Sequence, residues 1–118
     1  MSKLLIVDDE VAILEALTDI LSVEGYEVAT AANGAEGLKR AGEERPDLIL
    51  LDLMMPVMDG QEMLRRLKES TDLRTIPVVV MSAGRVSKSE LQGSRFLAKP
   101  FELDDLLDTV SAELNRVH

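Results

Sequence analysis

The chain has 118 residues and a mass of 13.0 kDa, and 46% of its residues are hydrophobic and 30% are charged. This length and composition suit one globular domain with its own core. Its formal charge of −9 disfavours nucleic acid or an anionic membrane as the main partner, because both attract a basic surface. The absence of cysteine excludes disulfides, thiol catalysis and cysteine-ligated metals, and the single histidine, His118, disfavours a histidine-based site.

Short apolar segments recur along the chain and predict five strands: Leu4–Val7, Val28–Ala31, Leu48–Leu51, Val78–Met81 and Phe96–Ala98. Three of them are apolar throughout, which is typical of strands buried on both faces of a parallel sheet. No segment is long enough to predict a membrane-spanning helix, and the first residues do not resemble a secretory signal. We therefore expect a cytoplasmic protein.

Helical patterns lie between these segments. The first has apolar residues at three- and four-residue spacing before Gly25, namely Ile13, Leu14, Leu17, Ile20 and Leu21. The next two open at Asn33 and Asp59, each with a glutamate three residues later, a spacing typical of a capped helix start. The last begins near Leu103 and carries one apolar stripe, namely Leu106, Leu107, Val110 and Leu114.

The segment between the fourth and fifth strands is different. Ser87 and Glu90 have capping-box spacing, but Gly93 follows almost at once and the apolar residues are few. This pattern predicts at most one or two helical turns, so the fourth helix is shortened or missing. The alternation as a whole predicts an α/β fold of the (βα)5 type, with helices on both faces of a parallel sheet.

Polar residues follow four of the five strands, at the edge where ligands bind in such sheets. These residues are Asp8, Asp9 and Glu10, then Asp52, then Ser82, then Lys99 with Pro100. Each alone is typical of a turn, a cap or a solvated charge, whereas the combination at four strand ends indicates a site. Asp8, Asp9 and Asp52 with Lys99 have a formal charge of −2, which one Mg²⁺ would neutralise. A carboxylate held against Mg²⁺ and a lysine can accept a phosphoryl group.

These motifs resemble the receiver domain of the response regulators of bacterial two-component signalling systems, over essentially the whole chain. They are Leu5-Ile6-Val7-Asp8-Asp9-Glu10, the run from Asp47 to Gly60, Pro77-Val78-Val79-Val80-Met81-Ser82-Ala83 and Phe96-Leu97-Ala98-Lys99-Pro100-Phe101. The resemblance implies a flavodoxin-like three-layer fold with strand order 2-1-3-4-5. We expect residues 1–118 to be a single receiver domain without an output domain.

The resemblance also implies roles for individual residues. Asp52 corresponds to the phosphoacceptor, and Asp8 and Asp9 to the acidic pair that holds Mg²⁺ together with Asp52. The backbone carbonyl of Met54 would join the metal, and Lys99 would pair with the phosphorylated group, with a cis bond between Lys99 and Pro100. The resemblance implies two switch residues. Ser82 would sense the phosphoryl oxygen, and Phe96 lies at the switch position that is aromatic in the family, where many relatives carry tyrosine.

Two features of the sequence concern the readout of phosphorylation, and the first is a departure from the family pattern. The gap of 17 positions from Ser82 to Lys99 is several short of the expected length, and the missing residues fall on the fourth helix. This helix belongs to the usual output and dimer surface of the family, so that surface is put in doubt while the site is not. Phe96 has no phenol hydroxyl, so a switch at this position would work by packing alone.

The leading hypothesis is a phosphoacceptor switch that receives its phosphoryl group from a sensor histidine kinase or a histidine phosphotransfer protein and then changes its binding to a downstream protein. It would catalyse only its own phosphorylation and dephosphorylation and is not predicted to be an enzyme with a separate substrate. The alternative is an interaction module that works without phosphorylation, suggested by the eroded fourth helix. A haloacid dehalogenase-type phosphatase is disfavoured by Met54 where an aspartate is needed, and a flavin binder by the repulsion between phosphate and Asp8-Asp9-Glu10.

Charges near the end of the chain allow a weak homodimer. Arg85, Lys88 and Arg95 lie in and after the short segment, and acidic residues gather on the final helix, namely Glu102, Asp104, Asp105, Asp108 and Glu113. Opposite charges on adjoining faces could pair across a two-fold axis. The other interpretation, solvated faces on a monomer, stays open at this point.

Overall fold

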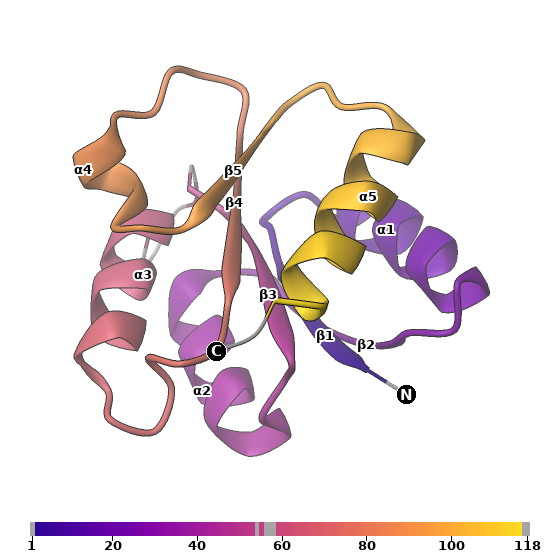
Figure 1. Cartoon of the computed structure of the whole chain (residues 1–118). Helices are drawn as coiled ribbons and strands as arrows, with labels where there is room; N and C mark the ends of the chain where they lie inside the picture. The colour runs from indigo at the N-terminus through magenta and orange to yellow at the C-terminus, as the bar shows by residue number, and fades with distance from the viewer. Residues whose placement is uncertain (1, 54, 56–58, 117–118) are drawn as a thin grey trace.

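The computed structural model describes residues 2–53, 55 and 59–116, and it has an alternating order of strands and helices (Figure 1). The strands are β1 (Lys3–Val7), β2 (Glu27–Ala31), β3 (Leu48–Asp52), β4 (Val78–Ser82) and β5 (Arg95–Ala98). The helices are α1 (Val11–Val23), α2 (Gly34–Glu44), α3 (Gly60–Glu69), α4 (Lys88–Leu91) and α5 (Leu103–Leu114). None of these helices combines the length and the apolar character that crossing a membrane requires.

The five strands form one parallel sheet in the order β2-β1-β3-β4-β5, which confirms the predicted topology. All residues of β3 and β4 are buried, as the continuous apolar runs predict for central strands. The register pairs Asp52 with Met81 and Ser82 with Ala98, so the ends of β3, β4 and β5 are level with one another. This level edge positions the candidate site.

Two helical layers cover the sheet, with α1 and α5 on one face and α2 and α3 on the other (Figure 1). Alternate strand residues supply the two cores: Leu50 and Val79 face α1 and α5, whereas Leu51 and Val80 face α2 and α3. Each fully buried aliphatic side chain contributes about 1.5–3 kcal/mol relative to an exposed one. The strands therefore provide the hydrophobic stabilisation that keeps the polar edge in place.

The predicted helix starts are confirmed by their hydrogen bonds. The Asn33 side chain accepts from the backbone N–H of Glu36 at 2.8 Å, and the Asp59 side chain accepts from that of Glu62 at 2.8 Å. Both hydrogen bonds of a capping box are present at Ser87, where α4 begins. Local sequence thus determines where these three helices begin.

The fourth helix has four residues, as the sparse apolar pattern predicts. It ends at Gln92 and Gly93, whose φ angles of 49° and 84° lie in the left-handed region. The side chain of Gln61 on α3 donates to the Glu90 carboxylate on α4. The capping box, the contact from Gln61 and the packing of Leu91 against the core therefore hold α4 in place.

Glu113 does not lie on an exposed acidic face, and the expectation that placed it there is wrong. The residue is 2% exposed, Arg116 donates to its Oε1 at 2.9 Å, and an Arg95 nitrogen lies 3.6 Å from its Oε2. Its position, three residues after the buried Val110, places it on the apolar stripe of α5. Arg95 and Glu113 thus pair within the chain instead of across the suggested dimer.

The capping box of α4 gives the first prediction. Hydrogen bonds from the backbone and side chain of Ser87, and then from Gln61, lower the pKa of the Glu90 carboxyl below its ordinary value of 4.5. The contribution of Glu90 to α4 is therefore present above pH 4.5 and is lost as the pH falls through the lowered pKa in the folded state. Ser87→Ala keeps the backbone N–H and removes the hydroxyl, so we expect this pKa to rise part of the way toward 4.5 in an NMR titration of the carboxyl carbons.

Glu62 provides the control within the same titration. Its pKa is lowered by hydrogen bonds from Arg65 and Arg66 on α3, and Ser87→Ala leaves these untouched. An unchanged Glu90 pKa in the variant, or an equal rise at Glu62, would show that the cap does not control the charge on α4.

Candidate functional site

Side chains from four strand ends meet at the carboxyl edge of the sheet. Asp8 follows β1, Asp52 ends β3, Ser82 ends β4, and Lys99 follows β5. Parallel strands bring these ends to the same edge, which is where ligands bind in open α/β sheets. The ion pairs that Lys99 forms with Asp8 and Asp52 bring these three side chains together.

The Lys99 ammonium lies between two buried carboxylates. Its Nζ donates to Asp8 Oδ2 at 2.9 Å and is 3.7 Å from Asp52 Oδ1. Asp8 is 0% exposed and Asp52 is 4% exposed, and the Lys99 side chain is 16% exposed. Carboxylates buried this deeply need an opposite charge or hydrogen bonds nearby. Lys99 supplies the opposite charge to both carboxylates and a hydrogen bond to Asp8.

The backbone orients Asp8 and gathers two further carboxylates beside it. Asp8 Oδ1 accepts from the backbone N–H of Glu10 at 3.0 Å, and the Asp8 backbone N–H donates to the carbonyl of Ala31 at 3.1 Å. Carboxylate oxygens of Asp8, Asp9 and Glu10 all lie within 4.8 Å of one another. Such an arrangement of oxygen ligands suits a hard divalent cation.

Glu10 is the residue of this cluster that the sequence analysis did not assign to a metal. Its exposed carboxylate lies within 4.8 Å of those of Asp8 and Asp9. Asp52 joins the site in a different way, because its carboxylate and that of Asp8 both form ion pairs with Lys99. The signal available in the sequence was the run of three consecutive acids. Met54, whose carbonyl the resemblance assigns to the metal, lies outside the described residues.

Ser82 connects the site to the loop after β5. Its side chain is buried and its Oγ accepts from the backbone N–H of Gly84 at 3.2 Å. Its carbonyl accepts from the Lys99 backbone N–H at 2.9 Å, and the Lys99–Pro100 peptide bond is cis. Ser82 therefore positions the backbone of Lys99 and leaves a hydroxyl at the same edge.

Phe96 lies away from this edge, two residues before the end of β5. Its partner in the register is Val80, and its half-buried ring packs against the core on the α2 and α3 face. The structure thus gives Phe96 a packing role, as a ring without a hydroxyl requires.

Comparison with known proteins identifies the family. A model of the response regulator receiver domain matches residues 4–111. The chain belongs to the response regulator receiver family. This receiver domain is 41% identical to the transcriptional regulatory protein PrrA of Mycobacterium tuberculosis over 97% of its own length, and it is 40% identical to the sporulation initiation phosphotransferase F of Bacillus subtilis over 95%. It spans 50% of the former protein and 93% of the latter.

Solved structures agree with this assignment. The chemotaxis protein CheY4 of Vibrio cholerae superposes with a TM-score of 0.88 at 34% identity, covering 95% of this chain and 98% of that one. A receiver domain of a Francisella response regulator gives a TM-score of 0.88 at 29% identity, with 98% of both chains covered. The fold and the family are therefore those that the motifs predict.

Gly60 at the start of α3 contacts the backbone of Asp52 in this receiver domain. A Cβ atom on Gly60 would clash with the Asp52 carbonyl oxygen and the Leu53 Cα, both of which are backbone atoms. The Gly60 backbone N–H also donates to the Leu53 carbonyl at 3.0 Å. The absence of a side chain thus allows α3 to approach the strand end that carries Asp52.

We predict that Gly60→Ala lowers the free energy of unfolding by about 1–3 kcal/mol, because the backbone beneath Asp52 must move. Gly42→Ala is the matched control, since a Cβ on Gly42 of α2 meets nothing within 4 Å. This second variant should be stabilising by about 0.5–1 kcal/mol. Urea unfolding measures both, and equal effects would contradict the tight approach at Asp52.

Proposed function

We propose that this receiver domain is a phosphorylation-driven switch whose phosphoacceptor is Asp52. The observation that supports it best is the buried Asp52 carboxylate, which lies next to Asp8 with one ammonium, that of Lys99, shared between them. A carboxylate in such a setting suits nucleophilic attack on phosphorus, because the neighbouring cation offsets the charge that the phosphoryl group brings.

The proposed donor is a phosphohistidine on a sensor histidine kinase or a histidine phosphotransfer protein. One Asp52 oxygen forms a bond to phosphorus while the phosphorus–nitrogen bond breaks, and the imidazole nitrogen keeps the electron pair. Hydrolysis later forms a bond from a water oxygen to phosphorus and breaks the bond to Asp52, which releases inorganic phosphate and restores the carboxylate. The domain would catalyse these two steps on itself alone.

Lys99 and Ser82 have separate parts in this proposal. Lys99 Nζ, 3.7 Å from Asp52 Oδ1, would donate to a phosphoryl oxygen and offset its charge. The Ser82 hydroxyl would donate to another phosphoryl oxygen, and Gly84 already donates to this hydroxyl. Through its carbonyl, Ser82 is hydrogen-bonded to Lys99, so both groups can respond together to phosphorylation.

The acidic cluster fits Mg²⁺, because its members offer closely spaced carboxylate oxygens and no nitrogen or sulfur. Asp8 and Asp9 would hold the ion together with Asp52 and the backbone carbonyl of Met54, and the exposed Glu10 carboxylate could bind through water. Bound Mg²⁺ would supply positive charge against the phosphoryl oxygens. Without a cation, this edge repels anions.

An apolar groove beside Lys99 is the proposed docking surface for the phosphodonor protein. It has a volume of about 500 Å³ and runs between α1 and the loop after β5. Its lining is mostly aliphatic and aromatic, namely Ile13, Ala16, Leu17, Ile20, Ala83, Lys99, Pro100 and Phe101. A helix of the partner protein bound in this groove would lie next to Lys99 and the phosphoacceptor site. We propose that this phosphoryl transfer takes place in the cytoplasm.

The short α4 supports a second candidate, an interaction module that works without phosphorylation. Because α4 has only four residues, it covers little of the surface between α3 and β5. A partner could bind that surface in the same way whether or not Asp52 is phosphorylated. The two candidates differ in one measurable property. A switch binds its downstream partner with different affinity once Asp52 is modified, whereas a fixed module binds equally in both states.

Phosphorylation can be tested directly by mass spectrometry. After incubation with a small-molecule phosphodonor and Mg²⁺, we expect the mass to rise by one phosphoryl group, and we expect no such rise in Asp52→Asn. Asp47→Asn is the control, because this exposed aspartate lies at the opposite end of β3. A wild-type protein that gains no mass, or an Asp52→Asn variant that still gains it, would refute the proposed phosphoacceptor.

Metal binding is tested by thermal unfolding. Because Mg²⁺ binds the folded site and relieves repulsion among the carboxylates, a concentration about a hundred times Kd should add about 2.7 kcal/mol to the free energy of unfolding. Asp9→Asn should weaken this effect, and Asp72→Asn, on the exposed loop after α3, should not. A melting temperature that does not respond to millimolar Mg²⁺ would contradict the metal assignment.

A further inference from the structure

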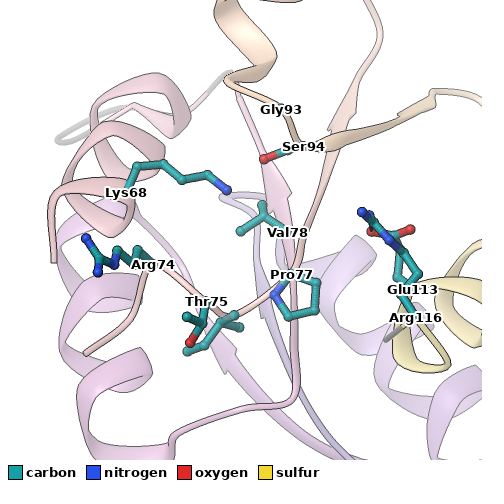
Figure 2. Close-up of a pocket in the computed structure, with 10 residues that line it drawn as sticks. Lys68, Arg74, Thr75, Pro77, Val78, Gly93, Ser94, Glu113 and Arg116 are labelled. Atoms are coloured by element: carbon teal, nitrogen blue, oxygen red, sulfur yellow. Dashed lines mark hydrogen bonds and ion pairs between the residues drawn. The ribbon is translucent and has the colours of Figure 1, made fainter. Parts of the chain in front are cut away.

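A second polar site lies at the end of the sheet opposite Asp52. It is a pocket of about 250 Å³ between the end of α3, the starts of β4 and β5, and the end of α5 (Figure 2). Its polar lining consists mainly of Lys68, Arg74, Ser94, Glu113 and Arg116. None of these residues takes part in the proposed phosphorylation chemistry.

Two buried oxygens in this pocket have no hydrogen-bond partner. They are Ser94 Oγ and Glu113 Oε2, and no other side-chain nitrogen or oxygen in the described part of the chain is both buried and without a hydrogen bond. Arg95 is 3.6 Å from Glu113 Oε2, close enough to offset its charge but too far for a good hydrogen bond. Buried polar atoms are rarely left unpaired, so their occurrence together indicates that a ligand donates to them.

Three cationic side chains also line the pocket. The Lys68 side chain extends from α3 toward Ser94 (Figure 2), and within the described residues it has no hydrogen bond or ion pair. Arg74 lies at the edge of the pocket with its guanidinium directed away from Lys68 (Figure 2), and Arg116 lies beside Glu113. Three cations against one carboxylate make this a basic site on an acidic chain, so it attracts an anion.

We infer that this pocket binds a small phosphate monoester that carries a neighbouring hydroxyl group. The phosphate would pair with Lys68, whose ammonium extends into the pocket, in a charge-assisted hydrogen bond (Figure 2). The hydroxyl would donate to Glu113 Oε2 and meet Ser94 Oγ. A ligand with an ammonium group fits less well, because Arg95 and Arg116 already face the Glu113 carboxylate.

The shortened fourth helix places Ser94 in this site. The left-handed turn at Gln92 and Gly93 reverses the chain directly after α4, and the Ser94 backbone N–H donates to the Leu91 carbonyl at 2.8 Å. Ser94 therefore reaches the start of β5 with its hydroxyl directed into the pocket (Figure 2). The segment that departs from the family pattern in length thus contributes a residue to the new site.

The test uses the whole chain and glycerol 3-phosphate without Mg²⁺, so that the carboxylates around Asp52 repel the ligand. In ¹⁵N NMR we expect saturable shifts at Lys68, Val78 and Ser94 and none at Asp8. Lys68→Gln should weaken binding about tenfold or more, because it removes a charge-assisted hydrogen bond. Lys39→Gln, at an exposed lysine of α2, is the matched control and should leave binding unchanged.

Three further measurements separate the parts of the inference. Ser94→Ala keeps every charge and should weaken glycerol 3-phosphate severalfold, while inorganic phosphate and glycerol alone should each bind far more weakly than the ester. Equal affinity for inorganic phosphate and the ester would identify an adventitious ion only. Unchanged binding in Lys68→Gln, or shifts centred on Asp8, would also overturn the inference, whatever the outcome of the phosphorylation tests.

Discussion

The site depends on one ammonium group shared by two buried carboxylates. Lys99 offsets part of the cost of burying Asp8 and Asp52, because a carboxylate cut off from water and from any cation would be strongly destabilising. The ammonium can reach both only if the ends of β1, β3 and β5 come within a few ångströms. The parallel sheet, its register and the close approach of α3 at Gly60 all serve this condition.

The features that sequence could predict are those set locally or by repeated spacing. Apolar runs locate the strands, and the side chains of Asn33, Asp59 and Ser87 fix helix starts through hydrogen bonds three residues away. The strand order came from the resemblance to receiver domains, because spacing alone does not select one parallel order. The four-residue α4 was also predictable, since its segment has too few apolar residues to form a longer buried face.

The features that sequence did not predict arise from contacts between distant segments. Glu113 was assigned to an exposed acidic face because glutamate is rarely buried, although its spacing from Leu106 and Val110 fits the buried stripe. The cost of burying it is offset by Arg116, three positions later, and by Arg95, eighteen positions earlier on β5. No local pattern indicates the pairing with Arg95. The contact between Gly60 and the Asp52 backbone is likewise visible only once α3 is packed against the sheet.

The two ends of the sheet carry local charges of opposite sign. At the carboxyl edge the carboxylates outnumber the single ammonium of Lys99, so this edge takes up a cation before it can accept a phosphoryl group. At the amino edge the cations outnumber the single carboxylate of Glu113, and that edge attracts an anion. The net charge of −9 does not reveal this separation, because it adds the charges of both ends of the sheet into one number. β4 and β5 run from one edge of the sheet to the other and connect the two sites. Both strands begin beside the basic pocket, at Val78 and just after Ser94, and they end at Ser82 and just before Lys99.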